Sequence, residues 1–567
     1  MKIKHFFGLA VLAAMTASCS SNNDLVNGGN GSGENESGAS YASFSINLPT
    51  TRGTRATDPT FDKGDVNEYD VFNATLLVFK KGIATSEGDY TFSERVDLGS
   101  MEPWKNPNET GVTTQSKITA KLSNVDKTDD YFALVLLNNG PDADPKVILP
   151  TVDTKYSKWN TADNATNKFT NTDKGFYMAN APLFKDNSVT TLVAIDKNKI
   201  FPTEAQASSG EAAADIYVER GLAKVTLTTA TKEEKTVGTS SSYAGDKVTI
   251  SNWALDVTNQ KTFPIHNVDG KTIDYADIWK NNATTSGASN QRFVDNNELT
   301  KAKRVYWGVD PNYNNNDLCN NDEARKENFN YIKKENLTAE PTDPLYCREN
   351  TFNLTNMVQG QTTRVIFKAR YTPKSFTAAD GKTFFKIGTS VALWKKKDLE
   401  DHIKAAVTKV ISGATTANTT IKLDATDNDI TTAGNHVIKA SNITVEGHEV
   451  TETEAIAVSD KVGLTKDAGI STYANGESYY IARIKHFGDA TPWTSGDAYG
   501  NDNLKYLGRY GMLRNNWYEL DVQSVSGPGY PGVPEVKPNT PDDENDNYLN
   551  VSVKILDWAK RSQSVDL

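Results

Sequence analysis

Short runs of apolar, aromatic and β-branched residues recur along the chain, separated by clusters of Gly, Asn, Asp and Pro. Such runs favour β-strands and such clusters favour turns. Many short strands between turn signals are typical of β-sandwiches or barrels. The pattern predicts strands at residues 74–80, 131–138, 189–195, 216–229, 247–257, 364–371, 479–485, 517–525 and 548–556.

Two further features divide the pattern. One helix is predicted at about residues 397–411, just ahead of Gly413. The polar stretch 203–213 separates two strand-rich halves, and we place a domain boundary there, at 210/211.

The segments near the two ends of the chain show the clearest alternation. Every second residue is apolar, and the residues between them are Ser, Asn or Lys. Because successive side chains of a strand point to opposite sides, each segment predicts a strand with four apolar side chains on one face. These positions are Ala42, Phe44, Ile46 and Leu48 in the first segment, and Leu549, Val551, Val553 and Ile555 in the second.

The residues next to these two strands differ: a site for proteolysis follows the first strand, and a long linker precedes the second. Arg52 and Arg55 follow the first strand in a polar stretch that a trypsin-like protease can cut. Residues 527–547, with five prolines and three glycines, precede the second. Such a linker is extended and spans roughly 60 Å at about 3.1 Å per residue. The first strand is therefore predicted to be removable, and the second to reach away from its own domain. The alternative is that the last strand pairs within its own domain.

The N-terminus has the order of a secretory signal. Lys2 and Lys4 precede a short apolar run that ends before Cys19. Cleavage just before a cysteine is the bacterial lipoprotein pattern, which makes Cys19 the predicted lipidation site. Thr16 departs from the leucine usual at that position, and an ordinary secretory signal is the alternative. Residues 20–40 are rich in Ser, Asn and Gly and predict a flexible tether.

Composition and motifs argue against several other functions. The net charge of −11 argues against a nucleic-acid partner, because phosphate binding needs a basic surface. Three cysteines exclude a multi-cysteine metal site. The Gly-Lys-Thr strings at 270–272 and 381–383 lack the earlier glycine of a phosphate-binding loop, and no other enzyme motif is complete. We therefore expect no enzyme, but the count of carboxylates alone leaves a glycosidase pair open. Cys319 and Cys347 are either free thiols or a disulfide worth roughly 3 kcal/mol.

Several strings, in this order after a lipoprotein leader, resemble the fimbrillins of Bacteroidales, the structural subunits of type V pili. The resemblance covers nearly the whole chain and is greatest to the major subunit of the short (minor, Mfa-type) fimbriae of Porphyromonas. The strings lie at residues 217–225, 307–313, 346–351, 479–487 and 508–518.

The resemblance implies an all-β fold with two transthyretin-like β-sandwich domains and a C-terminal donor strand on a Pro/Gly-rich linker. We expect a signal peptide at 1–18, a tether and propeptide strand at 19–55, and an N-terminal domain at 56–210. A C-terminal domain with insertions at 211–526 and a linker with donor strand at 527–567 complete the chain.

The same resemblance implies a fimbrial shaft subunit that supports adhesion and biofilm formation, with no catalysis and no required cofactor. Such subunits are exported as outer-membrane lipoproteins, cut after an arginine (here Arg55 or Arg52), and polymerised by strand exchange. The implied partners are further copies of the chain, accessory anchor and tip subunits, an Arg-specific protease, and host or bacterial surface receptors.

A surface glycan-binding lipoprotein is the alternative function. Glycan binding needs an exposed aromatic platform, and four tryptophans in polar surroundings are candidates for it: Trp104, Trp159, Trp394 and Trp493.

Overall fold

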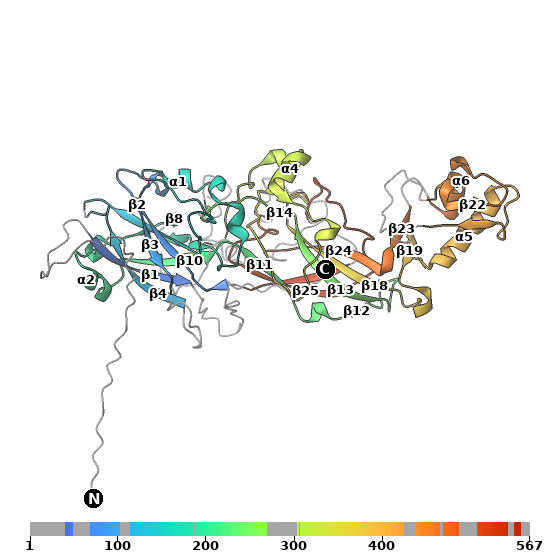
Figure 1. The fold of residues 1–567 in the computed structure, drawn as a ribbon, viewed down its shortest axis with the longest axis horizontal. Coiled ribbons are helices and arrows are strands. Elements are labelled where there is room, and N and C mark those ends of the chain that lie inside the picture. The colour runs from blue at the N-terminus through green and yellow to red at the C-terminus, as the bar shows by residue number, and fades with distance from the viewer. Residues whose placement is uncertain are drawn as a thin grey trace, which may run out of the picture.

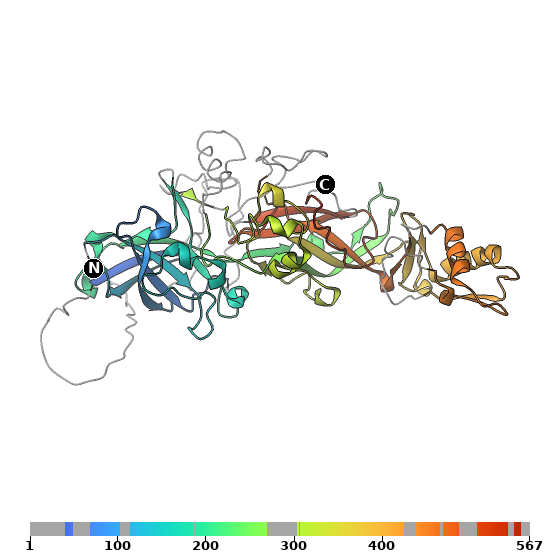
Figure 2. The same cartoon turned by 90° about the horizontal axis from the view of Figure 1, so that it is seen from above.

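The protein is mostly β-structure, with a few short helices, and forms three units along its long axis (Figures 1 and 2). The computed structural model describes residues 40–48, 68–101, 114–126, 128–185, 188–268, 303–305, 307–423, 438–464, 469–486, 507–542 and 549–556. An N-terminal β unit is followed by a second β unit, and a smaller mixed unit lies at the far end.

The N-terminal unit is built on one curled sheet of eight strands. Its order is β3-β2-β5-β6-β10-β1-β4, and β9 pairs with β5. The end strands approach each other, because Glu94 on β3 accepts hydrogen bonds from the backbone N–H groups of Ser123 and Asn124 just after β4 (2.9 and 3.1 Å). The strands are β1 (Ser40–Leu48), β2 (Ala74–Lys80), β3 (Thr91–Gly99), β4 (Thr114–Leu122), β5 (Tyr131–Leu137), β6 (Met178–Asn180), β9 (Val193–Ala194) and β10 (Ala214–Arg220).

Smaller elements cover the outside of this sheet. α1 (Tyr156–Trp159) lies over an aromatic cluster that includes Phe79 from β2. α2 (Glu204–Ser209) lies against β1 and β4. A small sheet has the order β15-β7-β8, with β7 (Leu183–Lys185), β8 (Ser188–Thr190) and β15 (Lys303–Arg304).

The chain crosses from the first unit to the second at Gly221. β10 belongs to the first sheet and β11 to the second, so the single strand predicted at 216–229 is two strands. A Cβ at Gly221 would lie 2.6 Å from the Phe169 ring, so only glycine lets the backbone pass this close. The crossing lies beyond the expected boundary at 210/211, because the polar stretch 203–213 holds α2 and β10 follows it.

The second unit has two four-stranded sheets around one hydrophobic core. The first has the order β17-β11-β25-β26, and the second β12-β13-β18-β24. A short β14-β16 pair and α4 lie beside them. The elements are β11 (Ala223–Leu227), β12 (Lys235–Thr236), β13 (Lys247–Asp256), β14 (Thr258–Asn259), α4 (Asp322–Asn328), β16 (Phe329–Asn330), β17 (Leu345–Cys347), β18 (Arg364–Thr372), β24 (Glu477–Arg483), β25 (Trp517–Val525) and β26 (Leu549–Leu556).

The third unit is inserted between β18 and β24 and has its own hydrophobic core. Leu399, Ile403 and Val407 recur along one face of α5 and are buried in that core. α6 begins with a capping box on Thr451 and ends at Gly463 in the left-handed region (φ 93°). The elements are β19 (Phe384–Ile387), β20 (Leu393–Trp394), α5 (Lys396–Val410), β21 (Thr419–Ile421), β22 (Ile443–Val445), α6 (Glu452–Val462) and β23 (Ile470–Tyr473).

The mainly β architecture agrees with the sequence pattern, and the predicted helix at 397–411 corresponds to α5. The prediction of a single helix is wrong, since α1, α2, α4 and α6 are also present. The two transthyretin-like sandwiches stay a prediction. In the described part of the chain, no helix is long and apolar enough to cross a membrane.

Candidate functional site

β1 is an interior strand of the N-terminal sheet. It pairs in parallel with β10, where Phe44 lies opposite Ala214, and antiparallel with β4 from Ser40 to Leu48. Both backbone edges of β1 are therefore hydrogen bonded to neighbours that come from later in the chain.

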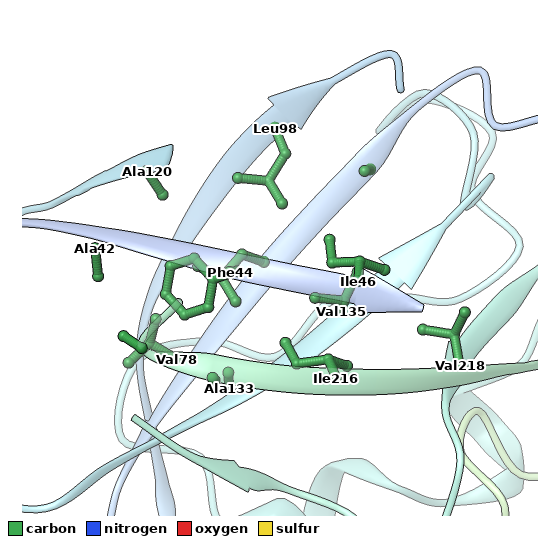
Figure 3. Close-up of a cluster of buried hydrophobic side chains, with 14 of the residues drawn as sticks. Ala42, Phe44, Ile46, Val78, Leu98, Ala120, Ala133, Val135, Ile216 and Val218 are labelled. Atoms are coloured by element: carbon green, nitrogen blue, oxygen red, sulfur yellow. The ribbon is translucent and has the colours of Figure 1, made fainter. Parts of the chain in front are cut away.

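The four alternating apolar residues of β1 face the core of this unit. Ala42, Phe44 and Ile46 are completely buried, and Leu48 is nearly so. Figure 3 shows Phe44 and Ile46 pointing among side chains of the surrounding strands, including Ile216 on β10. Burying one large apolar side chain contributes roughly 1.5–3 kcal/mol, so this face holds the strand firmly.

The other face of β1 is also covered, which the sequence did not indicate. Ser43 is 0% exposed, and its hydroxyl donates a hydrogen bond to the carbonyl of Ala207 in α2. The Ser43 and Thr119 hydroxyl oxygens are 3.2 Å apart, and Thr119 in turn contacts Ser208 of α2 at 3.0 Å. Ser45 is buried as well, whereas Asn47 is partly exposed. α2 thus forms a roof over the first half of β1.

Removing β1 would open a slot between β4 and β10. The floor of this slot would be the apolar core that β1 now covers. Its two edges would be the unpaired N–H and C=O groups of β4 and β10, and its roof would be α2. Unpaired strand edges beside an apolar floor are a template for another extended segment.

The last strand has a different position. Among the described residues, β26 is an edge strand that pairs with β25 alone, in antiparallel register. In this single chain, therefore, the last strand pairs within its own domain. Its four alternating apolar positions lie opposite buried residues of β25: Leu549 opposite Val525, Val551 opposite Val522, Val553 opposite Leu520, and Ile555 opposite Tyr518.

The remaining predicted site residues are placed as follows. Cys19, Arg52 and Arg55 lie outside the described residues. Cys319 and Cys347 are free thiols, so the disulfide considered for them is not formed. Cys347 is buried in the core of the second unit. The Cys319 sulfur lies 3.2 Å from the side-chain oxygen of Asn356 and 3.3 Å from the side-chain nitrogen of Gln361.

The tryptophans do not form an exposed platform in the described part of the chain. Trp159 is buried, and its indole N–H donates to the carbonyl of Ile148 (2.7 Å). Trp394 is half-buried and stacks on His402. Trp104 and Trp493 lie outside the described residues. Among the described residues, no group of His, Cys, Asp and Glu is arranged to hold a metal ion.

The C-terminal part of the chain matches a known family. Residues 471–564 match the model described as "major fimbrial subunit protein type IV, fimbrillin, C-terminal". The matched segment contains β24, β25 and β26. The match supports a fimbrial subunit at the cell surface with a structural role. No protein with a curated description matches the chain.

Two solved structures show distant likeness. A candidate cell adhesion protein from Parabacteroides distasonis aligns over 92% of this chain and 98% of its own, with 11% identity and a TM-score of 0.37. A fimbrial assembly protein from the same organism aligns over 40% of this chain and 67% of its own, with 12% identity and a TM-score of 0.23. TM-scores this low carry no argument about the fold.

Proposed function

We propose that this chain is a fimbrial shaft subunit that polymerises by replacing β1 with the β26 strand of a second copy. The observation that carries the proposal is the contrast between the two strands. β1 fills an interior slot with a neighbour on each side, whereas β26, with the same apolar alternation, lies at a sheet edge with one neighbour in the part of the chain that the structure describes. A strand that leaves an edge breaks one hydrogen-bonded ladder and forms two in the slot.

Maturation would control this exchange. While β1 is attached, it occupies its own slot and blocks entry of another strand. We propose that the precursor is a lipoprotein anchored at the outer membrane through Cys19, and that an Arg-specific protease cuts after Arg55 or Arg52 to release β1. Head-to-tail contacts between copies then propagate as a filament. Anchor and tip subunits, surface receptors and kinship to the Mfa-type shaft belong to the same proposal.

The roof over β1 favours one direction for the incoming strand. If residues 549–555 replace 42–48 in the same direction, all four apolar positions face the floor, and Lys554 takes the partly exposed place of Asn47. In the reverse direction Lys554 takes the place of Ser43, which is fully buried beneath α2. Burying an unpaired ammonium group is costly, so we propose that the incoming strand runs parallel to β10, as β1 does.

Cysteine pairs test this direction. In the proposed direction Asn550 takes the place of Ser43, which lies opposite Thr119 on β4. Filaments of Thr119→Cys/Asn550→Cys should give a ladder of covalent oligomers after mild oxidation, and Thr119→Cys/Lys554→Cys should not. The reverse result would overturn the direction but support strand exchange. If neither pair of cysteines cross-links, the result counts against the direction and against strand exchange.

A charge at a floor position tests strand exchange itself. Val553→Asp should abolish the ladder of heat-stable oligomers on gels, because a buried carboxylate would lie on the apolar floor. Lys554→Asp is the matched control, since the place of Asn47 is partly exposed, and it should polymerise. Ser552→Asp is a poor control, because the corresponding Ser45 is buried. Normal polymerisation of Val553→Asp would overturn strand exchange, and the loss of the ladder counts in its favour where the isolated subunit still melts cooperatively.

A further inference from the structure

A polar cleft of about 470 Å³ lies between the N-terminal unit and the second unit. Thr166, Asn167 and Thr170 line it from the N-terminal unit, and Gln260, Asn330 and Arg348 from the second. Most of these groups are hydroxyls and amides, which both donate and accept hydrogen bonds. The size falls within the usual range of small-molecule sites.

Arg348 brings a positive charge to this cleft. The residue is 8% exposed, and its guanidinium donates to two backbone carbonyls, of Gln260 and of Thr166 (3.1 Å). Its Nε has no hydrogen-bond partner among the described residues. Burial lowers the pKa of Arg348.

Two other buried arginines of the second unit each lie close to a carboxylate. The Arg364 Nε lies 2.8 Å from a carboxylate oxygen of Asp256, and the Arg514 Nε lies 3.4 Å from one of Glu349. Within the part of the chain that the structure describes, no ion pair is formed by Arg348. A buried guanidinium is stabilised by a carboxylate, and its fork matches carboxylate geometry.

We propose that this cleft binds an acidic sugar residue, a small polyhydroxylated ligand with one carboxylate. The carboxylate would pair with Arg348, and the sugar hydroxyls would bond to the surrounding Thr, Asn and Gln side chains. A peptide ligand fits less well, because peptide anchors need apolar pockets and these side chains are polar. Since the cleft is lined by both units, the bound sugar would also bridge them.

The proposal is tested by titrating the full-length chain with N-acetylneuraminic acid and with glucuronic acid, using calorimetry, and with glucose as the neutral probe. At least one acid should bind, and glucose about tenfold or more weakly, because it lacks the charged partner of Arg348. Arg348→Gln should weaken binding of the acid to the level of glucose. The affinity should also fall with added salt.

A second variant separates binding from folding. Thr170→Trp should block the cleft by bulk, because Thr170 is an exposed lining residue whose replacement leaves Arg348 in place. Thr85→Trp, at an exposed position elsewhere, is the matched control and should bind as the unchanged chain does. Equal binding of glucose and acid, no binding of either acid, or full binding by Thr170→Trp would overturn the proposal. Each of these results leaves strand exchange untouched, because the cleft lies outside the β1 slot.

Discussion

The sulfur atoms of Cys347 and Cys319 have different surroundings. Cys347 is buried among apolar side chains, and burial raises its pKa to about 12. Cys319 is only half-buried. Because the thiolate is the reactive form, iodoacetamide at about pH 8 should label Cys319 and leave Cys347 unmodified in the folded chain. Both should react after unfolding without reductant, as read by mass spectrometry of peptides. Protection of both until a reductant is added would indicate the disulfide.

Asp310 is a buried carboxyl group that makes the second unit sensitive to pH. It accepts hydrogen bonds from the backbone N–H groups of Asn312 and Thr351 (both 2.7 Å), yet burial raises its pKa from 3.8 to about 7. Between these values the folded chain keeps a proton that the unfolded chain has released. The free energy of unfolding should therefore fall as the pH rises through this window, by at most about 4 kcal/mol.

Asp310→Asn should flatten this dependence, because the amide does not titrate. Urea unfolding at several pH values between about 4 and 7 measures the slope. Asp163→Asn, at an exposed position, is the control and should keep the slope of the unchanged chain. A variant at 310 with an unchanged slope would assign the titration to another group.

Among the elements, strands with dense runs of apolar residues were predictable, and their tertiary neighbours were not. The predicted limits of β2 and β25 agree with the structure, because their apolar residues fill a core. The polar stretch 203–213 predicts a domain boundary, whereas the structure places α2 there, with Ala207 buried. Its contact with Ser43 joins residues 164 positions apart. No local pattern carries that information, so the alternation within β1 does not indicate that Ser43 is covered.

The roof formed by α2 gives a prediction for β1. Ser43→Leu should destabilise the precursor by roughly 1–3 kcal/mol, because a larger side chain must fit beneath α2 and the hydrogen bond to Ala207 is lost. Asn47→Leu, on the same face but partly exposed, should cost much less. Urea unfolding of the uncleaved chain compares the two. Equal losses of unfolding free energy in the two variants would mean that α2 does not limit the size of the side chain at position 43.

At the scale of the whole molecule, a buried ion pair joins the first two units. The Lys224 ammonium lies 2.7 Å from Glu68, and the Tyr346 hydroxyl donates to the same carboxylate (2.6 Å). Lys224→Met should destabilise the contact by about 3–5 kcal/mol, because the buried Glu68 carboxylate loses the ammonium group that lies 2.7 Å from it. Calorimetry should then show the N-terminal unit melting separately. Adding Glu68→Gln should restore part of the loss, and a double variant no more stable than the single one would contradict this role.

The insertion between β18 and β24 has a consequence for how the molecule can change over time. These two strands are neighbours in one sheet, and Arg370 near the start of the inserted unit lies opposite Glu477 at its end. The two strands therefore stay hydrogen bonded to each other up to the base of the inserted unit. The inserted unit has a core of its own at the far end of the molecule (Figure 2). Recombination could exchange this module for one of another length or sequence while every ladder of the sheet below is kept. On a surface fimbria, antibodies raised against the module would recognise the part of the chain that is freest to vary.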